Sequence, residues 1–136
     1  MVTGVFGVNI AVQDLDAAVK KYEGVLGIKA EPFRPEDFAF PGLKGAKLDV
    51  GGVYINLISY TDNKTSIAKF IESKGEGLFL LSFKVADFDK DIEVMKANGA
   101  KPLLEKPIDV EVGRVNFIHP KSMHGVQLEI IQTRSK

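Results

Sequence analysis

Two kinds of hydrophobic spacing alternate along the chain. In the runs "FGVNIAV" and "FLLSFKV" apolar residues fall at every second position, which is the spacing of a strand with one buried face. After each run, apolar residues recur every three or four positions, as on the buried side of a helix. Asp14 and Asp87 stand where helix N-caps are expected. The pattern therefore predicts strands over residues 5–12 and 78–85, each followed by an amphipathic helix that ends at a glycine, Gly27 or Gly99.

Shorter apolar runs complete each half of the chain. They predict further strands at 29–33, 47–50 and 53–59, and at 101–104, 114–118 and 126–132. Between the halves, "NKTSIAKFIESKGEG" predicts one short helix over 66–73 and a glycine-rich exit. We therefore expect a first βαβββ module over 1–60, a connector over 61–77 and a second βαβββ module over 78–136, all within one domain.

The two halves are copies of one pattern. "FGVNIAVQDLDAAVKKY" (6–22) aligns with "FLLSFKVADFDKDIEVM" (79–95) without a gap. The same offset aligns the last strand of each half, and it places Glu129 opposite Asn56 in the alignment. A repeat that keeps one register at both ends predicts an α+β fold built from two βαβββ modules.

Composition narrows the class of protein. The chain has 136 residues, of which 45% are hydrophobic and 26% charged, as in ordinary globular domains. Eighteen basic residues balance eighteen acidic ones, so we expect no nucleic-acid partner. No apolar run approaches the roughly 20 residues that span a bilayer, so we expect no membrane partner. Cysteine is absent, which excludes disulfides and thiol nucleophiles and agrees with a cytoplasmic location.

Three stretches resemble a known family. "IAVQDLDAAVKKYEGVLGI", "TSIAKFIESKGEG" and "FIHPKSMHGVQLEI" are similar in order and spacing to members of the vicinal oxygen chelate superfamily, which includes glyoxalase I, bleomycin resistance proteins and extradiol dioxygenases. Within it, the methylmalonyl-CoA epimerase family is the nearest match. The resemblance implies that the two modules form an eight-stranded mixed sheet that curves into a cup. It also implies that a small carbonyl or acyl-CoA molecule binds there and that the chain forms a homodimer.

The resemblance also implies four metal-ligand positions. They fall on Gly7, Asn56, Leu80 and Glu129, where the family ordinarily shows oxygen or nitrogen donors. Gly7 and Leu80 have no donor side chain, and one carboxylate with one amide is a weak ligand set for a divalent cation. We therefore expect no family metal and no other cofactor.

Strand alternation extends these positions to a candidate binding surface, because residues two apart on a strand share a face. Gly7 is accompanied by Asn9, Leu80 by Ser82 and Lys84, and the last strands add Tyr54 and Gln127. The candidate substrate-binding residues are Asn9, Tyr54, Asn56, Ser82, Lys84 and Gln127. The polar ones offer hydrogen bonds to a substrate carbonyl, or to ordered water in a pocket without chemistry.

Glu129 is the candidate catalytic residue. A carboxyl group in a partly apolar site has a raised pKa and can act as a proton-transfer base. The alternative is a solvated acid, or one in a salt bridge with Lys84. Such a pair would either silence the acid or supply the cation that stabilises an enolate. A displaced metal site using His124 and Glu129 is a further alternative.

These residues support two main hypotheses of function. The first is an epimerase-like or isomerase-like enzyme that removes an α-proton next to a carbonyl or acyl-CoA thioester without the family metal, with Glu129 as the base. Its second proton-transfer group is not identified. The alternative is a metal-free small-molecule binding protein, similar to bleomycin resistance proteins. A third reading is a catalytically inactive copy that serves assembly with partners.

Overall fold

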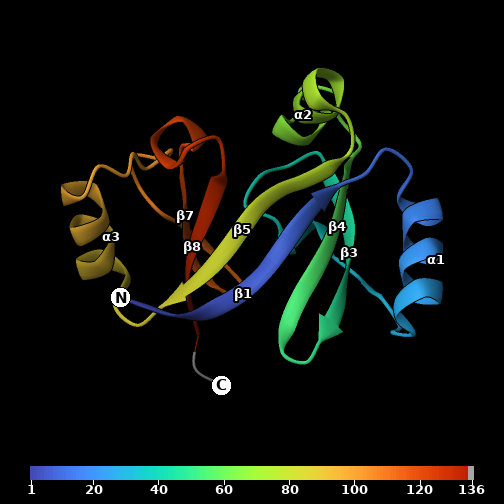
Figure 1. Cartoon of the computed structure of the whole chain (residues 1–136), viewed down its shortest axis with the longest axis horizontal. Coiled ribbons are helices and arrows are strands. Elements are labelled where there is room, and N and C mark those ends of the chain that lie inside the picture. Colours follow the sequence, from blue (N-terminus) through green and yellow to red (C-terminus); the bar gives the residue numbers. More distant parts are fainter. Residues whose placement is uncertain (135–136) are drawn as a thin grey trace. The chain divides into compact units, whose positions relative to one another are not determined.

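The computed structural model describes residues 1–134 and has the α+β composition expected from the pattern (Figure 1). Each half of the chain follows the order strand, helix, three strands. The elements are β1 Val2–Ala11, α1 Leu15–Leu26, β2 Glu31–Pro32, the 3-10 turn η1 Pro35–Asp37, β3 Leu43–Val50, β4 Val53–Tyr60, α2 Ser66–Lys74, β5 Gly77–Val85, α3 Phe88–Ala97, β6 Ile108–Val110, β7 Gly113–Ile118, η2 Pro120–Met123 and β8 Gln127–Thr133.

The strands form an eight-stranded mixed sheet in the order β2-β3-β4-β1-β5-β8-β7-β6. β1 pairs in parallel with β4, and β5 pairs in parallel with β8, while the outer pairs in each half are antiparallel. The chain divides into two compact units, each of which is described separately. The first unit is Gly7–Phe79, and the second unit is Met1–Phe6 with the chain from Leu80 onward.

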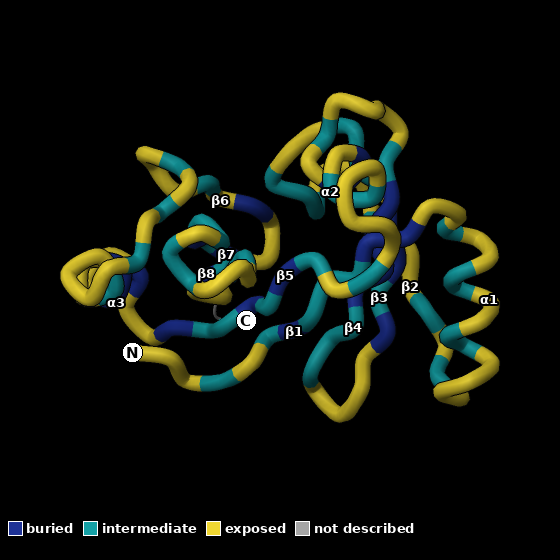
Figure 2. The backbone as a smooth tube through the Cα atoms, turned by 45° about the horizontal axis from the view of Figure 1, so that its top comes forward, coloured by how far each residue is buried: buried dark blue, intermediate teal, exposed yellow. Residues whose placement is uncertain are grey.

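In the first unit, α1 covers one face of the sheet as its spacing predicts. Asp14 caps it by accepting a hydrogen bond from the Ala17 N–H, and Gly27 ends it in the left-handed region at φ 69°. The helix has no buried residue, and Figure 2 shows it exposed or half-buried throughout. Its apolar side nevertheless packs on a core cluster of Val12, Leu48 and Leu57 together with Ile10, Leu15, Ala18, Val19, Tyr22, Ile28, Ala30 and Ile55.

The connector helix α2 packs on the opposite face of the first unit. Thr65 caps it by accepting a hydrogen bond from the Ala68 N–H, and Ile67 is buried against Ala11 and Ile58. Four phenylalanines complete this cluster: Phe33 and Phe38 meet edge to face at 5.3 Å between ring centroids, and Phe70 and Phe79 do so at 5.2 Å. The face away from α1 is therefore partly covered, which alternation alone did not predict.

In the second unit, α3 occupies the place that α1 has in the first. Asp87 caps it through the Lys90 N–H, and its apolar side packs on the sheet. The core cluster comprises Val85, Phe88, Ile92, Ile118 and Ile130, with Phe83, Met95, Ala100, Met123 and Leu128 packed against it. In each unit we call the sheet face away from α1 or α3 the polar face, because the candidate site residues lie on it.

Two predicted strands are wrong or shortened. Residues 101–104 form only an isolated bridge between Pro102 and Ile118, and the second strand of the second module is β6, Ile108–Val110. Pro102 has no N–H to donate to a ladder. The buried Asn116 side chain instead accepts from the Leu104 N–H at 3.2 Å and donates to the Leu104 carbonyl at 3.0 Å. The strand predicted at 29–33 shrinks to Glu31–Pro32.

No helix within residues 1–134 is long and apolar enough to cross a membrane.

Candidate functional site

Two pairs of polar side chains occupy equivalent places in the two units. On β1 and β4 of the first unit, Asn9 lies directly beside Asn56. On β5 and β8 of the second unit, Ser82 lies directly beside Glu129. The internal repeat aligns Asn9 with Ser82 and Asn56 with Glu129, so one structural position carries an amide pair in one copy and an acid with a hydroxyl in the other.

The Ser82 and Glu129 side chains are bonded to one another. The Ser82 hydroxyl donates to Glu129 Oε1 at 2.6 Å, and Ser82 is fully buried. On the neighbouring strand β7, the buried Phe117 lies in register with Glu129. Burial raises the pKa of Glu129 above its ordinary 4.5, and the Ser82 hydrogen bond partly opposes that shift. The carboxylate that forms on ionisation is therefore more basic than a solvated one.

Lys84 does not neutralise this acid. It lies in register with Ile131. Its Cε atom packs near Gly4, 3.4 Å from the place that a Cβ atom would take there. Within residues 1–134 no ion pair joins Lys84 to Glu129, so the predicted salt-bridge alternative is not present. Gln127, the remaining candidate of this unit, lies half-buried on β8 in register with Leu80.

The Asn9 and Asn56 side chains are also bonded to one another. Asn56 Nδ2 donates to Asn9 Oδ1 at 2.8 Å. Asn56 is only 8% exposed, and its Oδ1 is buried without any hydrogen-bond partner among residues 1–134. Buried polar atoms in folded proteins are nearly always paired, so such an atom marks a place where a partner is missing. Tyr54, the other candidate of this unit, is half-buried and lies beside Gly7.

Lys47 is a site residue that sequence reasoning missed. β3 places it in register with Asn56, so it shares the polar face of the first unit. Its Nζ lies 5.1 Å from the centre of the Tyr54 ring and 6.0 Å from that of Phe33. Lys47 begins a predicted strand, but nothing in the sequence pairs that strand with Asn56. Only the register of β3 against β4 shows that Lys47 lies beside Asn56.

Comparisons with known proteins match this fold and these strands. Residues 7–117 match the model of the glyoxalase/bleomycin resistance protein/dioxygenase superfamily. The chain belongs to this superfamily. It is 30% identical over 128 residues to an ethylmalonyl-CoA/methylmalonyl-CoA epimerase of Cereibacter sphaeroides, covering 92% of this chain and 94% of the relative.

Two solved structures of this superfamily have the same fold. The methylmalonyl-CoA epimerase of Mycobacterium tuberculosis superposes with a TM-score of 0.87 at 33% identity, covering 98% of this chain and 90% of that one. A Streptomyces coelicolor methylmalonyl-CoA epimerase variant in complex with 2-nitronate-propionyl-CoA superposes with a TM-score of 0.87 at 28% identity, covering 99% and 100%. These similar proteins are acyl-CoA epimerases, and one of them holds an acyl-CoA ligand.

Two of the four positions that the resemblance assigns to metal ligands, Gly7 and Leu80, have no donor side chain. β1 and β4 approach so closely at Gly7 that a Cβ there would lie 2.6 Å from the Tyr54 carbonyl oxygen. Leu80 is apolar and 3% exposed. Asn56 and Glu129 retain donor atoms, one in each unit. Within residues 1–134 no three His, Cys, Asp or Glu side chains gather as metal ligands.

The two histidines have local roles. His119 Nδ1 accepts a hydrogen bond from the Lys121 N–H and so caps η2. His124 ends η2 in the left-handed region at φ 56°, and it is exposed. The structure records no contact between His124 and Glu129, so the displaced metal site stays without support.

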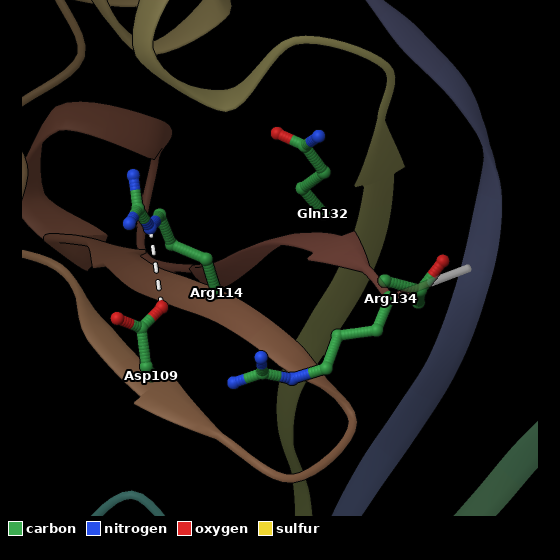
Figure 3. A pocket seen from close by; sticks show the side chains of 5 residues that line it. Asp109, Arg114, Gln132 and Arg134 are labelled. Atoms are coloured by element: carbon green, nitrogen blue, oxygen red, sulfur yellow. Dashed lines mark hydrogen bonds and ion pairs between the residues drawn. The ribbon is translucent and has the colours of Figure 1, made fainter. Parts of the chain in front are cut away.

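A polar pocket lies near the end of β8 in the second unit (Figure 3). It encloses about 470 Å³ and is lined by Asp109, Arg114, Gln132, Thr133 and Arg134. Arg114 forms ion pairs with Asp109 at 3.2 Å and with Asp89 at 3.5 Å. Arg134 donates to the carbonyl oxygens of Val110 and Glu111. These contacts hold strands and α3 together, and the opposite charges balance, so they indicate a structural role.

Proposed function

We propose that the protein is an epimerase-like enzyme that removes the α-proton beside the thioester carbonyl of an acyl-CoA, with Glu129 as the base and without the superfamily's metal. The observation that carries this proposal is the Glu129 carboxyl group, which is held by the buried Ser82 hydroxyl and has a raised pKa. The similarity to acyl-CoA epimerases supports the same reaction class. Perturbed carboxyl pKa values are common where proton transfer is catalysed.

The proposed step moves one proton. Ionised Glu129 accepts the α-proton on Oε2, since Oε1 receives the Ser82 hydrogen bond. The electrons of the broken C–H bond move to the thioester oxygen, which gives an enolate and a protonated Glu129. Return of a solvent-derived proton restores the thioester. Epimerisation also needs a proton donor on the opposite side of the α-carbon, and this group is not yet identified.

The metal-free form of the proposal rests on Gly7 and Leu80. Neither side chain has a donor atom, and the close approach of β1 to β4 leaves no room for a longer one at Gly7. An enolate would then be stabilised by protein hydrogen-bond donors instead of a cation.

The test is α-proton exchange of methylmalonyl-CoA in deuterated buffer, followed by NMR with chelator-treated protein. We expect wild-type exchange to survive the chelator and Glu129→Gln to lose it by at least about 100-fold, as for a general base. Glu72→Gln, an exposed glutamate of α2, is the matched control and should exchange at the wild-type rate. Exchange that disappears with the chelator would overturn the metal-free reaction, and exchange that persists in Glu129→Gln would exclude this base.

The second candidate is metal-free small-molecule binding, which the absence of donors at Gly7 and Leu80 favours. Calorimetric titration with methylmalonyl-CoA separates the two functions. Tight binding by folded protein that catalyses no exchange would support the binding role and contradict the enzymatic one.

We also propose that the chain acts as a homodimer. The outermost strands β2 and β6 each have one unpaired edge in the described sheet, and a second copy of the chain would cover such an edge. Light scattering coupled to size exclusion should give twice the chain mass.

A further inference from the structure

We propose that Lys47, together with the Asn56 and Asn9 amides, forms a carboxylate-binding subsite on the polar face of the first unit. Its ligand would be the free carboxylate of a 2-alkylmalonyl thioester. The choice of this acyl group rests on the proposed function. The subsite itself rests on the contacts of the first unit alone.

The three side chains form a row across three neighbouring strands. Lys47 of β3 is in register with Asn56 of β4, and Asn56 is in register with Asn9 of β1. Residues in register on adjacent strands project from the same face of a sheet. A cation and two amides therefore lie side by side, and the apolar cluster under α2 begins one residue pair further along, at Ala11 and Ile58.

Within residues 1–134, the Lys47 ammonium group has no carboxylate counter-ion. Its Nζ lies over the faces of the Tyr54 and Phe33 rings, at 5.1 and 6.0 Å from their centres. Aromatic rings attract a cation but do not neutralise its charge. Lys47 is half-buried, and no carboxylate within residues 1–134 is recorded as its ion-pair partner. A half-buried cation without a carboxylate is suited to an anionic ligand.

The amide pair supplies the second contact. Asn56 Oδ1 is buried and has no hydrogen-bond partner in the described part of the chain, and its side chain is more than nine-tenths buried. If both amides turn by 180°, Asn9 Nδ2 donates to Asn56 Oδ1 and the hydrogen bond between the two side chains is kept. Asn56 Nδ2 then takes the position of the unpaired oxygen and presents an N–H to the ligand. A carboxylate would accept from this N–H and from the Lys47 ammonium together.

The test compares two thioesters that differ in the carboxylate. Calorimetry would measure the Kd of methylmalonyl-CoA and of propionyl-CoA, which lacks the free carboxylate, for wild type, Lys47→Met and Lys47→Arg. We expect Lys47→Met to weaken methylmalonyl-CoA binding by about 10- to 100-fold, typical of a lost charge-assisted hydrogen bond. Its propionyl-CoA binding should equal that of wild type. Lys47→Arg should recover most of the loss, since it keeps the charge.

Lys44→Met is the matched control. Lys44 is on the same strand, is exposed and projects from the other face, so both Kd values should be unchanged. Circular dichroism would confirm that each variant is folded. Equal weakening of both thioesters by Lys47→Met, no weakening of either, or no binding of methylmalonyl-CoA by wild type would overturn the subsite.

The proton-exchange measurement separates this inference from the proposed function. Lys47-dependent binding without any exchange by wild type would leave the subsite standing and reject the enzyme. Wild-type exchange with unaltered methylmalonyl-CoA binding in Lys47→Met would reject the subsite and leave the enzyme standing.

Discussion

Glu129 and Asn56 show how one residue changes the chemistry of an otherwise repeated position. Both lie on the last strand of their module, beside a polar residue of the first strand. In the first unit the neighbour is an amide, and in the second it is the Ser82 hydroxyl, which donates to the acid. The second unit therefore holds a titratable group, whereas the first holds a neutral pair.

Removing the Ser82 hydroxyl should make Glu129 harder to ionise. The hydrogen bond lowers the pKa of Glu129 while burial raises it, so Ser82→Ala leaves only the effect of burial. We expect the pKa of Glu129 to rise further, and any exchange activity to require a higher pH. A ¹³C NMR titration of the Glu129 carboxyl carbon, assigned with Glu129→Gln, measures this directly. An unchanged or lower pKa would contradict the role given to Ser82.

Gly7 is expected to tolerate no side chain, because β1 and β4 lie too close together there. Gly7→Ala would put a methyl group 2.6 Å from the Tyr54 carbonyl oxygen, and the strands would have to separate. We expect a loss of about 1–3 kcal/mol in the free energy of unfolding, the usual range for overpacking. Gly24→Ala is the control: no atom lies within 4 Å of the new methyl group, which sits in α1. It should stabilise by about 0.5–1 kcal/mol. Urea denaturation measures both.

At the scale of elements, the two modules differ where the repeat predicts similarity. In the first unit, α2 and the segment with Phe33 and Phe38 cover part of the polar face. In the second unit, the segment before β6 makes only an isolated bridge to β7. It is held by backbone hydrogen bonds of Lys101 and Leu103 and by the Asn116 side chain. Strands with the same hydrophobic pattern are therefore covered by different segments in the two modules.

Asn116 is expected to stabilise that segment at Leu104. Its amide replaces two ladder hydrogen bonds to Leu104, and it is only 3% exposed. Asn116→Ala should lower the free energy of unfolding by about 1–3 kcal/mol, because it leaves the Leu104 peptide groups without these partners. Asn63→Ala, at an exposed position before α2, should change it by less than about 0.5 kcal/mol. Equal effects of the two substitutions in urea denaturation would refute this account.

At the scale of the whole molecule, two carboxyl groups make the free energy of unfolding depend on pH with opposite signs. The Asp87 N–H, followed by the Met1 ammonium group at 3.1 Å, lowers the pKa of Asp91 below its ordinary 3.8. The stability that Asp91 contributes is present above that value and is lost as the pH falls through its folded pKa. Burial raises the pKa of Glu129, so its contribution is present below 4.5 and is lost as the pH rises through its folded pKa.

Glu129→Gln should therefore stabilise the protein selectively at neutral and alkaline pH. Its amide removes the requirement to bury a charge, while its oxygen can still accept from Ser82. We expect the free energy of unfolding of the variant to exceed that of wild type at pH 8 and the difference to shrink toward pH 4. Urea denaturation across this range measures the difference, and a pH-independent difference would show that Glu129 does not titrate as described.

The sequence by itself determined the elements and their repetition. Spacing and caps are local features, so Asp14, Asp87 and Gly27 marked helix ends that the structure confirms, and the repeat alone aligned Asn56 with Glu129. The resemblance pointed to the superfamily from three stretches of the chain, and the comparisons confirm it. The α+β fold with two βαβββ modules was accessible at this level.

The tertiary structure alone decided which side chains meet. The Ser82–Glu129 hydrogen bond and the place of Lys47 beside Asn56 depend on which strands are neighbours and in what register. Lys84 shares a face with Ser82 yet lies in register with Ile131, so face alone did not predict its partner. Periodicity reports the face of a residue within its own strand, whereas hydrogen bonds and desolvation depend on residues that are distant along the chain.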